Sequence, residues 1–155
     1  MVTSPAVASI PAVTEEAAGL SDLLMRVART QRRRWRTVLA PWDLSPHQAR
    51  ALRVVCEGGA GVRLSDLAET LHIAPRSATE VADGLQQRGL VERAPDPGDR
   101  RAVLLRPTAE GRRVRAEVDR ARTADSEQLF ARLSADDRAA LARLLGTLAD
   151  DEPSG

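Results

Sequence analysis

Residues 65–106 read SDLAETLHIAPRSATEVADGLQQRGLVERAPDPGDRRAVLLR, and this stretch decides the fold. Ser65 is suited to cap a short helix, and Pro75 is suited to open a second one that runs to about Arg88. Gly89 is placed to end that helix in the left-handed conformation. Apolar residues recur at helical spacing on the face of each helix that we expect to be buried. They are Leu67, Ala68, Leu71, Ala78, Val81 or Ala82, and Leu85.

A β-hairpin is predicted after this helix pair. Two short extended segments, 90–94 and 101–106, flank the sequence PDPGDR at 95–100, which is dense in turn formers. Pro107 has no backbone N–H to donate to a ladder, so we expect the hairpin to end one residue early. Helix, turn, helix and hairpin in this order are typical of the winged helix-turn-helix, whose second helix can enter the major groove of DNA.

Two helices and a very short strand are predicted before this unit. Apolar residues recur at spacings of three and four from Glu15 to Leu39, and Pro41 ends that helix. The sequence SPHQ at 45–48 has the form of a capping box, so a second helix is expected to start there and run to about Glu57. Residues 62–64 alternate apolar and polar, as in a half-buried strand.

Two more helices are predicted after the hairpin. Thr108 is expected to cap a long helix from Ala109 to about Leu133, and Ser134 to open the last one. The last helix has an unbroken leucine stripe, and such a stripe needs a partner. Its members are Leu141, Leu144, Leu145 and Leu148. The predicted fold class is therefore mainly α with a small β-hairpin wing.

Polar side chains on the second helix of the pair are candidates for contacts with DNA. Its early outward positions can donate to or accept from base edges and phosphates. They are Arg76, Ser77, Thr79 and Glu80. A solvated helix face would also be polar, so this feature alone leaves both interpretations open.

The tip of the hairpin favours DNA. Asp99 and Arg101 are two residues apart, so in an extended strand they point to the same side, where the carboxylate can orient the guanidinium. An arginine oriented in this way on a protruding loop suits insertion into a minor groove. Arg100 faces the other way, toward phosphate, and Arg93 on the first strand is a further candidate. The alternative for Asp99 and Arg101 is an ordinary surface ion pair.

The sequence DPGDRR at 96–101, followed by Leu105 and by TAEG at 108–111, carries a resemblance to a known family. From Pro46 to Gly111 the chain resembles the MarR-type repressors, and with less specificity the resemblance covers about Glu15 to Ala149. It implies a homodimer in which the first helix (15–40) and the last two (108–149) interlock. Two winged units (45–106) would then reach successive major grooves of a pseudo-palindromic operator in double-stranded DNA.

The resemblance also assigns residues. The wing-tip arginine of the family corresponds to Arg101 and its aspartate to Asp99, while the recognition-helix contacts correspond to Arg76, Ser77, Thr79 and Glu80. A hydroxyl residue is common just before the recognition helix, but here Ala74 stands there and is a poor cap. We therefore expect the start of this helix to be shifted or frayed.

Composition limits the other classes of function. The 155 residues suit one domain, expected at 15–150 between tails at 1–14 and 151–155, and the net charge of +1 does not by itself indicate a nucleic-acid partner. A single cysteine and the lack of an apolar run near the roughly 20 residues that span a bilayer favour a cytoplasmic protein, nucleoid-associated when bound to DNA, with no membrane partner. His47 and His72 have no partner at metal-ligand spacing, and no nucleophile–base pair or phosphate-binding loop is evident. We predict no catalytic residue, metal or cofactor, and hence no enzyme.

A basic cluster lies near the end of the first predicted helix, where six arginines occur without an acid: Arg26, Arg29, Arg32, Arg33, Arg34 and Arg36. It could touch flanking DNA or attract an anionic effector, but a solvated or partner-facing surface is favoured. Trp35 and Trp42, together with Arg32, could line a pocket for a small anionic or aromatic effector, although packing is the commoner role of tryptophan. Cys56, on the inward face of the second predicted helix, is expected to be a small core residue rather than a redox sensor.

Together these observations predict a sequence-specific transcription regulator, a repressor that a small molecule releases from its operator. The alternative from another class is a winged-helix module that binds a protein and not specific DNA. An ordered Asp99–Arg101 pair on an exposed tip favours DNA binding, because a protein-interaction module does not require such a pair.

Overall fold

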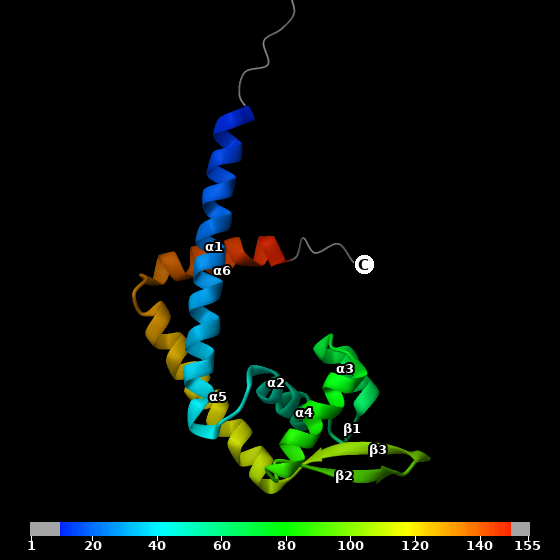
Figure 1. Ribbon diagram of the computed structural model, residues 1–155. Helices are drawn as coiled ribbons and strands as arrows, with labels where there is room; N and C mark the ends of the chain where they lie inside the picture. The colour runs from blue at the N-terminus through cyan, green and yellow to red at the C-terminus, as the bar shows by residue number, and fades with distance from the viewer. Residues whose placement is uncertain (1–9, 150–155) are drawn as a thin grey trace, which may run out of the picture. The chain divides into compact units, whose positions relative to one another are not determined.

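The computed structural model describes residues 10–149, apart from the side chains of residues 10–14, 100 and 101 (Figure 1). The described residues up to Thr37 form one compact unit, and those from Val38 onward form a second. Of the predicted tails at 1–14 and 151–155, residues 1–9 and 151–155 lie outside the described residues. No helix in the described part is both long and apolar enough to cross a membrane.

The first helix, α1 (Ile10–Leu39), begins at Ile10 and not at Glu15. The predicted tail was therefore too long, and the reason is the place of Pro11. This proline falls in the first turn of the helix, where its missing N–H has no intrahelical partner to lose. As expected, the helix ends before Pro41, which lies in a short 3-10 turn, η1 (Ala40–Trp42).

The second helix, α2 (Pro46–Glu57), has the predicted bounds and the predicted cap. The backbone N–H of Gln48 donates to the Ser45 hydroxyl at 3.1 Å, and the N–H of Ser45 donates to the Gln48 side chain at 2.9 Å. This reciprocal pair satisfies two backbone groups that a helix terminus would otherwise leave without an intrahelical partner.

Replacing Ser45 with alanine is expected to lower the free energy of unfolding by about 1 kcal/mol, because Gln48 loses its hydrogen-bond acceptor. Denaturant unfolding at one fixed protein concentration measures this loss in the free energy of unfolding. Ser65→Ala is the matched control. Ser65 lies inside the next helix, α3 (Leu64–Leu71), and caps nothing, so we expect a change within about 0.5 kcal/mol. Equal losses in the two variants would contradict the assignment of Ser45 as a cap and of Ser65 as a residue that caps nothing.

Ser65 does not cap the third helix, and the prediction that it would was wrong. The helix α3 (Leu64–Leu71) starts directly after β1 (Val62–Arg63), so Arg63 stands at the cap position with an extended backbone and makes no side-chain hydrogen bond to the helix. The hydroxyl of Ser65 donates to Asp66 instead. Strand pairing of Arg63 with Leu104 fixes where the extended segment ends, and this tertiary constraint overrides the local capping signal.

The helix α4 (Pro75–Gln87) starts at Pro75 despite the poor cap at Ala74, so its start is not shifted. Ala74 already has an extended backbone, and Pro75 supplies a backbone angle suited to a first helical residue. At the other end, Gly89 has a φ of +68°. The N–H groups of Gly89 and Leu90 close the helix on the carbonyls of Gln86 and Leu85, as predicted from the glycine.

The strands form an antiparallel sheet in the order β1-β3-β2, with β2 (Val91–Asp96) and β3 (Asp99–Pro107) as the hairpin. Both strands are longer than predicted, which leaves Pro97 and Gly98 as the turn. The hairpin does not end early at Pro107, which is paired with Val91. Beyond it the N–H of Thr108 donates to the Leu90 carbonyl at 3.1 Å, so the ladder continues past the proline, which still has a carbonyl.

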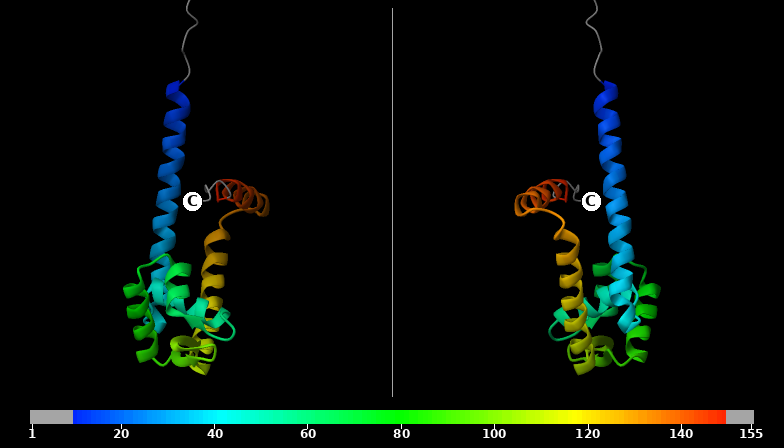
Figure 2. Two further views of the ribbon diagram at one scale, coloured as in Figure 1. Left: turned by 90° about the vertical axis from the view of Figure 1, so that its right-hand side faces the viewer. Right: turned by 90° about the vertical axis from the view of Figure 1, so that its left-hand side faces the viewer.

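Two helices complete the second unit. Thr108 caps α5 (Ala109–Phe130) through a hydrogen bond from the N–H of Gly111, and Ser134 caps α6 (Ala135–Ala149) in the same way through Asp137, both as predicted. The helix α5 ends three residues before the predicted Leu133. It runs from the wing to α6 (Figure 2). No residue of α6 is buried.

The core lies between α2, α3, α4, the sheet and the first half of α5. Its completely buried large side chains are Leu39, Leu52, Val55, Leu67, Leu85, Val91 and Leu105. On α4 the buried residues are Ala78, Ala82 and Leu85, so the inward position left open in the sequence is Ala82 and not Val81. Cys56 is half-buried rather than a fully enclosed core residue. This core fixes α4 and the wing relative to each other.

Candidate nucleic-acid interface

The outward face of α4 carries the predicted recognition residues. Arg76, Thr79 and Glu80 are exposed, and Ser77 is half-buried. The Arg76 side chain, 91% exposed, pairs with Glu80 one turn later, where Nε and Oε1 are 3.2 Å apart. Because such an exposed pair is weak, Arg76 can exchange it for a phosphate or a base at little cost.

The wing presents Asp99, Arg100 and Arg101 at the start of β3. The side chains of Arg100 and Arg101 lie outside the described residues, so the oriented Asp99–Arg101 pair stays a prediction. The backbone of residues 99–101 is extended, which is the conformation that the prediction assumes. In the register of the hairpin, Asp99 on β3 lies opposite Asp96 on β2.

Arg93, predicted to touch DNA, lies between the wing and α4. One nitrogen of its guanidinium is 2.6 Å from Asp83 Oδ1, and the other donates to the side chain of Gln86. Both partners are on α4, so Arg93 links the first strand of the wing to the recognition helix. Sequence reasoning named the residue but missed these partners.

A second arginine of the sheet, Arg63, was not singled out by the sequence. It pairs with Asp96 at the end of β2, with Nε and Oδ2 3.0 Å apart. Asp96 also accepts from the N–H of Gly98 at 2.8 Å. This backbone hydrogen bond, followed by the hydrogen bond from Arg63, holds the pKa of the Asp96 carboxyl below its usual value. The only signal in the sequence was the turn former Asp96 two residues before Gly98.

Trp42 takes part in a polar network at the start of α5. Its indole N–H donates to Glu117 at 3.0 Å, and Arg113 pairs with Glu117 at 2.6 Å and with Glu110 at 2.5 Å. The hydrogen bond from Trp42 and the positive charge of Arg113 hold the pKa of Glu117 below its usual value, although partial desolvation opposes them. Glu117 is therefore ionised at neutral pH.

The lowered pKa of Glu117 predicts a pH dependence of stability. A carboxyl whose pKa is lower in the folded state adds stability above its unfolded pKa, about 4.3 for glutamate, and loses it as the pH falls through the folded value. The thermal midpoint of the wild type should exceed that of Glu117→Gln by a constant amount from neutral pH down to about pH 5, and the difference should shrink in more acidic solution. Glu127→Gln, on the same helix, is the control and should change the midpoint little. A difference between wild type and Glu117→Gln that grows in acid would contradict the network.

The residues predicted to line an effector pocket belong to different units of the structure. Trp42 lines a hollow of about 470 Å³ together with Arg88, Leu90, Arg113 and Val114. Trp35 is half-buried and Arg32 exposed on α1, within the first unit, so their share in a pocket with Trp42 stays a prediction.

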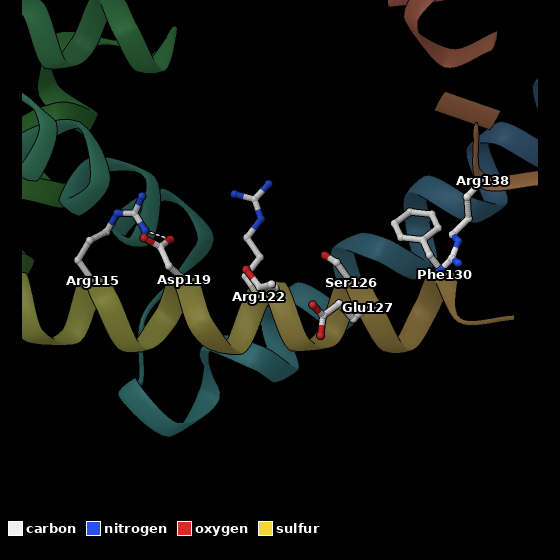
Figure 3. A pocket seen from close by; sticks show the side chains of 8 residues that line it. Arg115, Asp119, Arg122, Ser126, Glu127, Phe130 and Arg138 are labelled. Carbon is white, nitrogen blue, oxygen red and sulfur yellow. Dashed lines mark ion pairs between the residues drawn. The ribbon is translucent and has the colours of Figure 1, made fainter. Parts of the chain in front are cut away.

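A second hollow, of about 560 Å³, lies along α5 and the start of α6 (Figure 3). Arg115, Arg122 and Arg138 line it, but Asp119 and Glu127 do so as well, and Arg115 is paired with Asp119. Most of its positive charge is therefore offset by carboxylates.

Cys56 is the single cysteine of the chain and is half-buried on α2. Burial raises the pKa of the Cys56 thiol, against the opposing influence of Arg115 and Arg112, so the thiol stays protonated at neutral pH and is a poor nucleophile. Among residues 10–149 the structure contains no group of three histidine, cysteine, aspartate or glutamate side chains that could hold a metal ion.

Comparison with known proteins identifies the family. A family model described as MarR family matches residues 42–102, from Trp42 through the tip of the wing. The uncharacterised helix-turn-helix (HTH) type transcriptional regulator Mb0904 of Mycobacterium bovis is 34% identical over 137 residues, which are 86% of this chain and 94% of that protein. An uncharacterised regulator of the same type, YsmB of Bacillus subtilis, is 30% identical over 104 residues, which are 67% of this chain and 70% of that protein.

This chain belongs to the MarR family. It is therefore a transcriptional regulator with the winged-helix fold, of a family that consists of regulators and not of enzymes. A MarR family protein from Bacillus stearothermophilus has the same fold, with a TM-score of 0.78, 25% identity and coverage of 89% of this chain and 96% of that one. A mutant of E. coli MarR, solved in complex with operator DNA, matches with a TM-score of 0.70 and 27% identity over 86% of this chain and 95% of that one.

Proposed function

We propose that this MarR-family chain represses transcription by occupying an operator in double-stranded DNA and excluding the polymerase. The main support for the proposal is that α4 has an exposed polar face and lies next to the wing. The ion pair between Arg93 on β2 and Asp83 on α4 links the wing to this helix. In this arrangement α4 enters a major groove while the wing tip, with Arg101, reaches the adjacent minor groove. The likeness to an E. coli MarR mutant bound to operator DNA supports it.

A homodimer is the proposed form of the protein in the cytoplasm. Large apolar side chains are exposed on α1, where Leu20 is 63% exposed, and on α6, where Leu148 is 64% exposed. Isolated exposed leucines are ordinary, but a stripe of them at helical spacing needs cover, and a second copy of the same helices supplies it. A twofold dimer then requires two half-sites about 10 base pairs apart, related by pseudo-palindromic symmetry.

We also propose that a small aromatic molecule releases the DNA. The hollow at Trp42 has a volume within the usual range for ligand sites, with Trp42, Leu90 and Val114 as apolar walls. Its arginines are already paired with carboxylates, which disfavours a highly charged anion. Quenching of tryptophan fluorescence by a ligand that also releases the operator would support this part, and an operator complex insensitive to every aromatic ligand tried would contradict it.

The alternative function, a module that binds a protein through its leucine-rich helices, is separated from repression by one experiment. Binding of the purified protein to the duplex upstream of its own coding sequence is measured at several salt concentrations, with a scrambled duplex as control. A repressor should prefer the upstream duplex by about a thousandfold or more, and its affinity should fall steeply with salt as phosphate counterions are released. Equal affinity for the two duplexes, or none for either, would favour the interaction module.

A further inference from the structure

Arg63 occupies the N-cap position of α3, but its side chain does not cap that helix. It is the residue before α3, yet its side chain makes no hydrogen bond to the first turn of that helix. The guanidinium instead reaches the last residue of β2, where Nε and Nη2 lie 3.0 and 2.5 Å from Asp96 Oδ2. The Asp96 side chain is only 12% exposed and that of Arg63 is 44% exposed. The pair is therefore screened from water on the side of the aspartate.

The pair bridges the two edge strands of the sheet. In the strand order β1-β3-β2, the middle strand β3 separates Arg63 on β1 from Asp96 on β2 (Figure 1). Arg63 is aligned with Leu104 on β3, whereas Asp96 lies at the far end of β2, opposite Asp99. The arginine side chain thus spans from the start of the helix-turn-helix to the base of the wing turn.

Asp96 in turn fixes the shape of that turn. Its second oxygen, Oδ1, accepts from the backbone N–H of Gly98 at 2.8 Å, at a point where the register of the hairpin shifts. The strand that carries Arg101 begins directly after this turn. The conformation at Asp96 therefore sets the direction in which the first residues of β3 leave the turn.

A separate link anchors the same strand to α4. Arg93, three residues before Asp96, pairs with Asp83 at 2.6 Å. The strand β2 is consequently attached to α4 at Arg93 and to the start of α3 at Asp96. With both links in place, the wing cannot swing relative to the helix pair without breaking an ion pair.

We propose that Arg63 and Asp96 are positioning residues of the DNA interface: they hold the wing turn so that Arg101 meets the minor groove together with α4. The inference rests on the proposed function. Neither residue touches DNA in this account. A partly exposed ion pair adds little to global stability, so its role is to restrict the conformations of the wing before DNA binds and so reduce the ordering cost of binding.

The test measures operator affinity of the full-length protein for single and double variants. Arg63→Ala and Asp96→Asn should each weaken binding to the upstream duplex by about tenfold, and the double variant should be no worse than either single one, because both remove the same interaction. Asparagine keeps an oxygen that can accept from Gly98, so this variant isolates the ion pair. Arg53→Ala, an exposed arginine on α2, is the control for the loss of one positive charge and should have little effect.

A further arm separates positioning from direct contact. When Arg101 is already alanine, Arg63→Ala should have no additional effect on affinity. Amide hydrogen exchange at residues 98–101 of the free protein should be faster in Arg63→Ala, while exchange in α4 and the thermal midpoint stay close to those of the wild type. If the pair merely supported the fold, Arg63→Ala would instead lower the thermal midpoint and speed amide exchange throughout the second unit.

Three results would overturn the inference, and they differ from one another. An additive loss in the Arg101→Ala background would show that Arg63 contacts DNA directly. Unchanged affinity and unchanged exchange in Arg63→Ala would show that the pair positions nothing. Faster wing exchange, combined with full operator binding by Arg101→Ala, would instead contradict the proposed DNA contact of the wing, and the positioning role would fail with it.

Discussion

Arg101→Ala is expected to lower the affinity for the operator by about 100-fold. Each wing of the dimer would lose one arginine from a minor groove, and a specific contact of this kind is worth about 1–3 kcal/mol. Binding to scrambled duplex should change much less, because phosphate contacts elsewhere remain. The measurement is a titration of labelled duplex with each protein at several salt concentrations.

Two controls make the result specific. Arg53→Ala removes the same charge from α2 and should retain operator affinity, and sedimentation should show that the Arg101→Ala protein has the same oligomeric state as the wild type. If Arg101→Ala and Arg53→Ala bind the operator equally well, the wing does not read the minor groove, and Asp99 and Arg101 are ordinary surface residues.

Gly111→Ala is expected to cost about 3 kcal/mol or more of folding free energy. Gly111 lies in the first turn of α5 and is buried against the segment between α4 and β2. A Cβ there would overlap the carbonyl oxygen of Leu90 and lie 2.9 Å from its carbonyl carbon. Backbone cannot move aside as a side chain can, and the same carbonyl accepts from the N–H of Thr108. The clash therefore disrupts both the cap of α5 and the end of the wing ladder.

Gly146→Ala is the matched control for this substitution. Gly146 lies within α6, where a Cβ would meet no atom within 4 Å, so alanine should be neutral or should stabilise the helix by about 0.5–1 kcal/mol. Denaturant unfolding of the three proteins at equal concentration measures both effects. Similar unfolding midpoints for Gly111→Ala and Gly146→Ala would contradict the close approach of α5 to Leu90.

The features predicted correctly from the sequence are those that depend on a few neighbouring residues. The capping box at Ser45, the cap at Thr108 and the left-handed Gly89 each follow from local backbone chemistry, and the structure confirms all three. The order of helices, hairpin and helices also follows from local patterns, which is why the winged-helix fold could be predicted.

The errors and omissions have a common cause in tertiary contacts. Ser65 is a reasonable cap in isolation, but pairing of β1 with β3 sets the start of α3. Arg63 and Asp96 are 33 residues apart, and only the order of strands in the sheet brings them together. No local pattern carries that information.

The same limit applies to the polar network at α5. Trp42 and Glu117 are separated by 75 residues, so the hydrogen bond between them could not be read from spacing. The arginine cluster beside Trp42 in the sequence predicts that this tryptophan lines a pocket, and in the structure it lines a hollow. The carboxylates that neutralise the neighbouring arginines were not anticipated, and they change the ligand that the hollow would favour.

Hydroxyl-radical footprinting of the wild type on its own upstream DNA tests whether α4 and the wing read one operator together. We expect two protected segments about 10 base pairs apart, related by twofold symmetry and flanked by protected minor grooves, with the flanking protection lost in Arg101→Ala. A uniform pattern without discrete protection, or flanking protection that persists in Arg101→Ala, would contradict it.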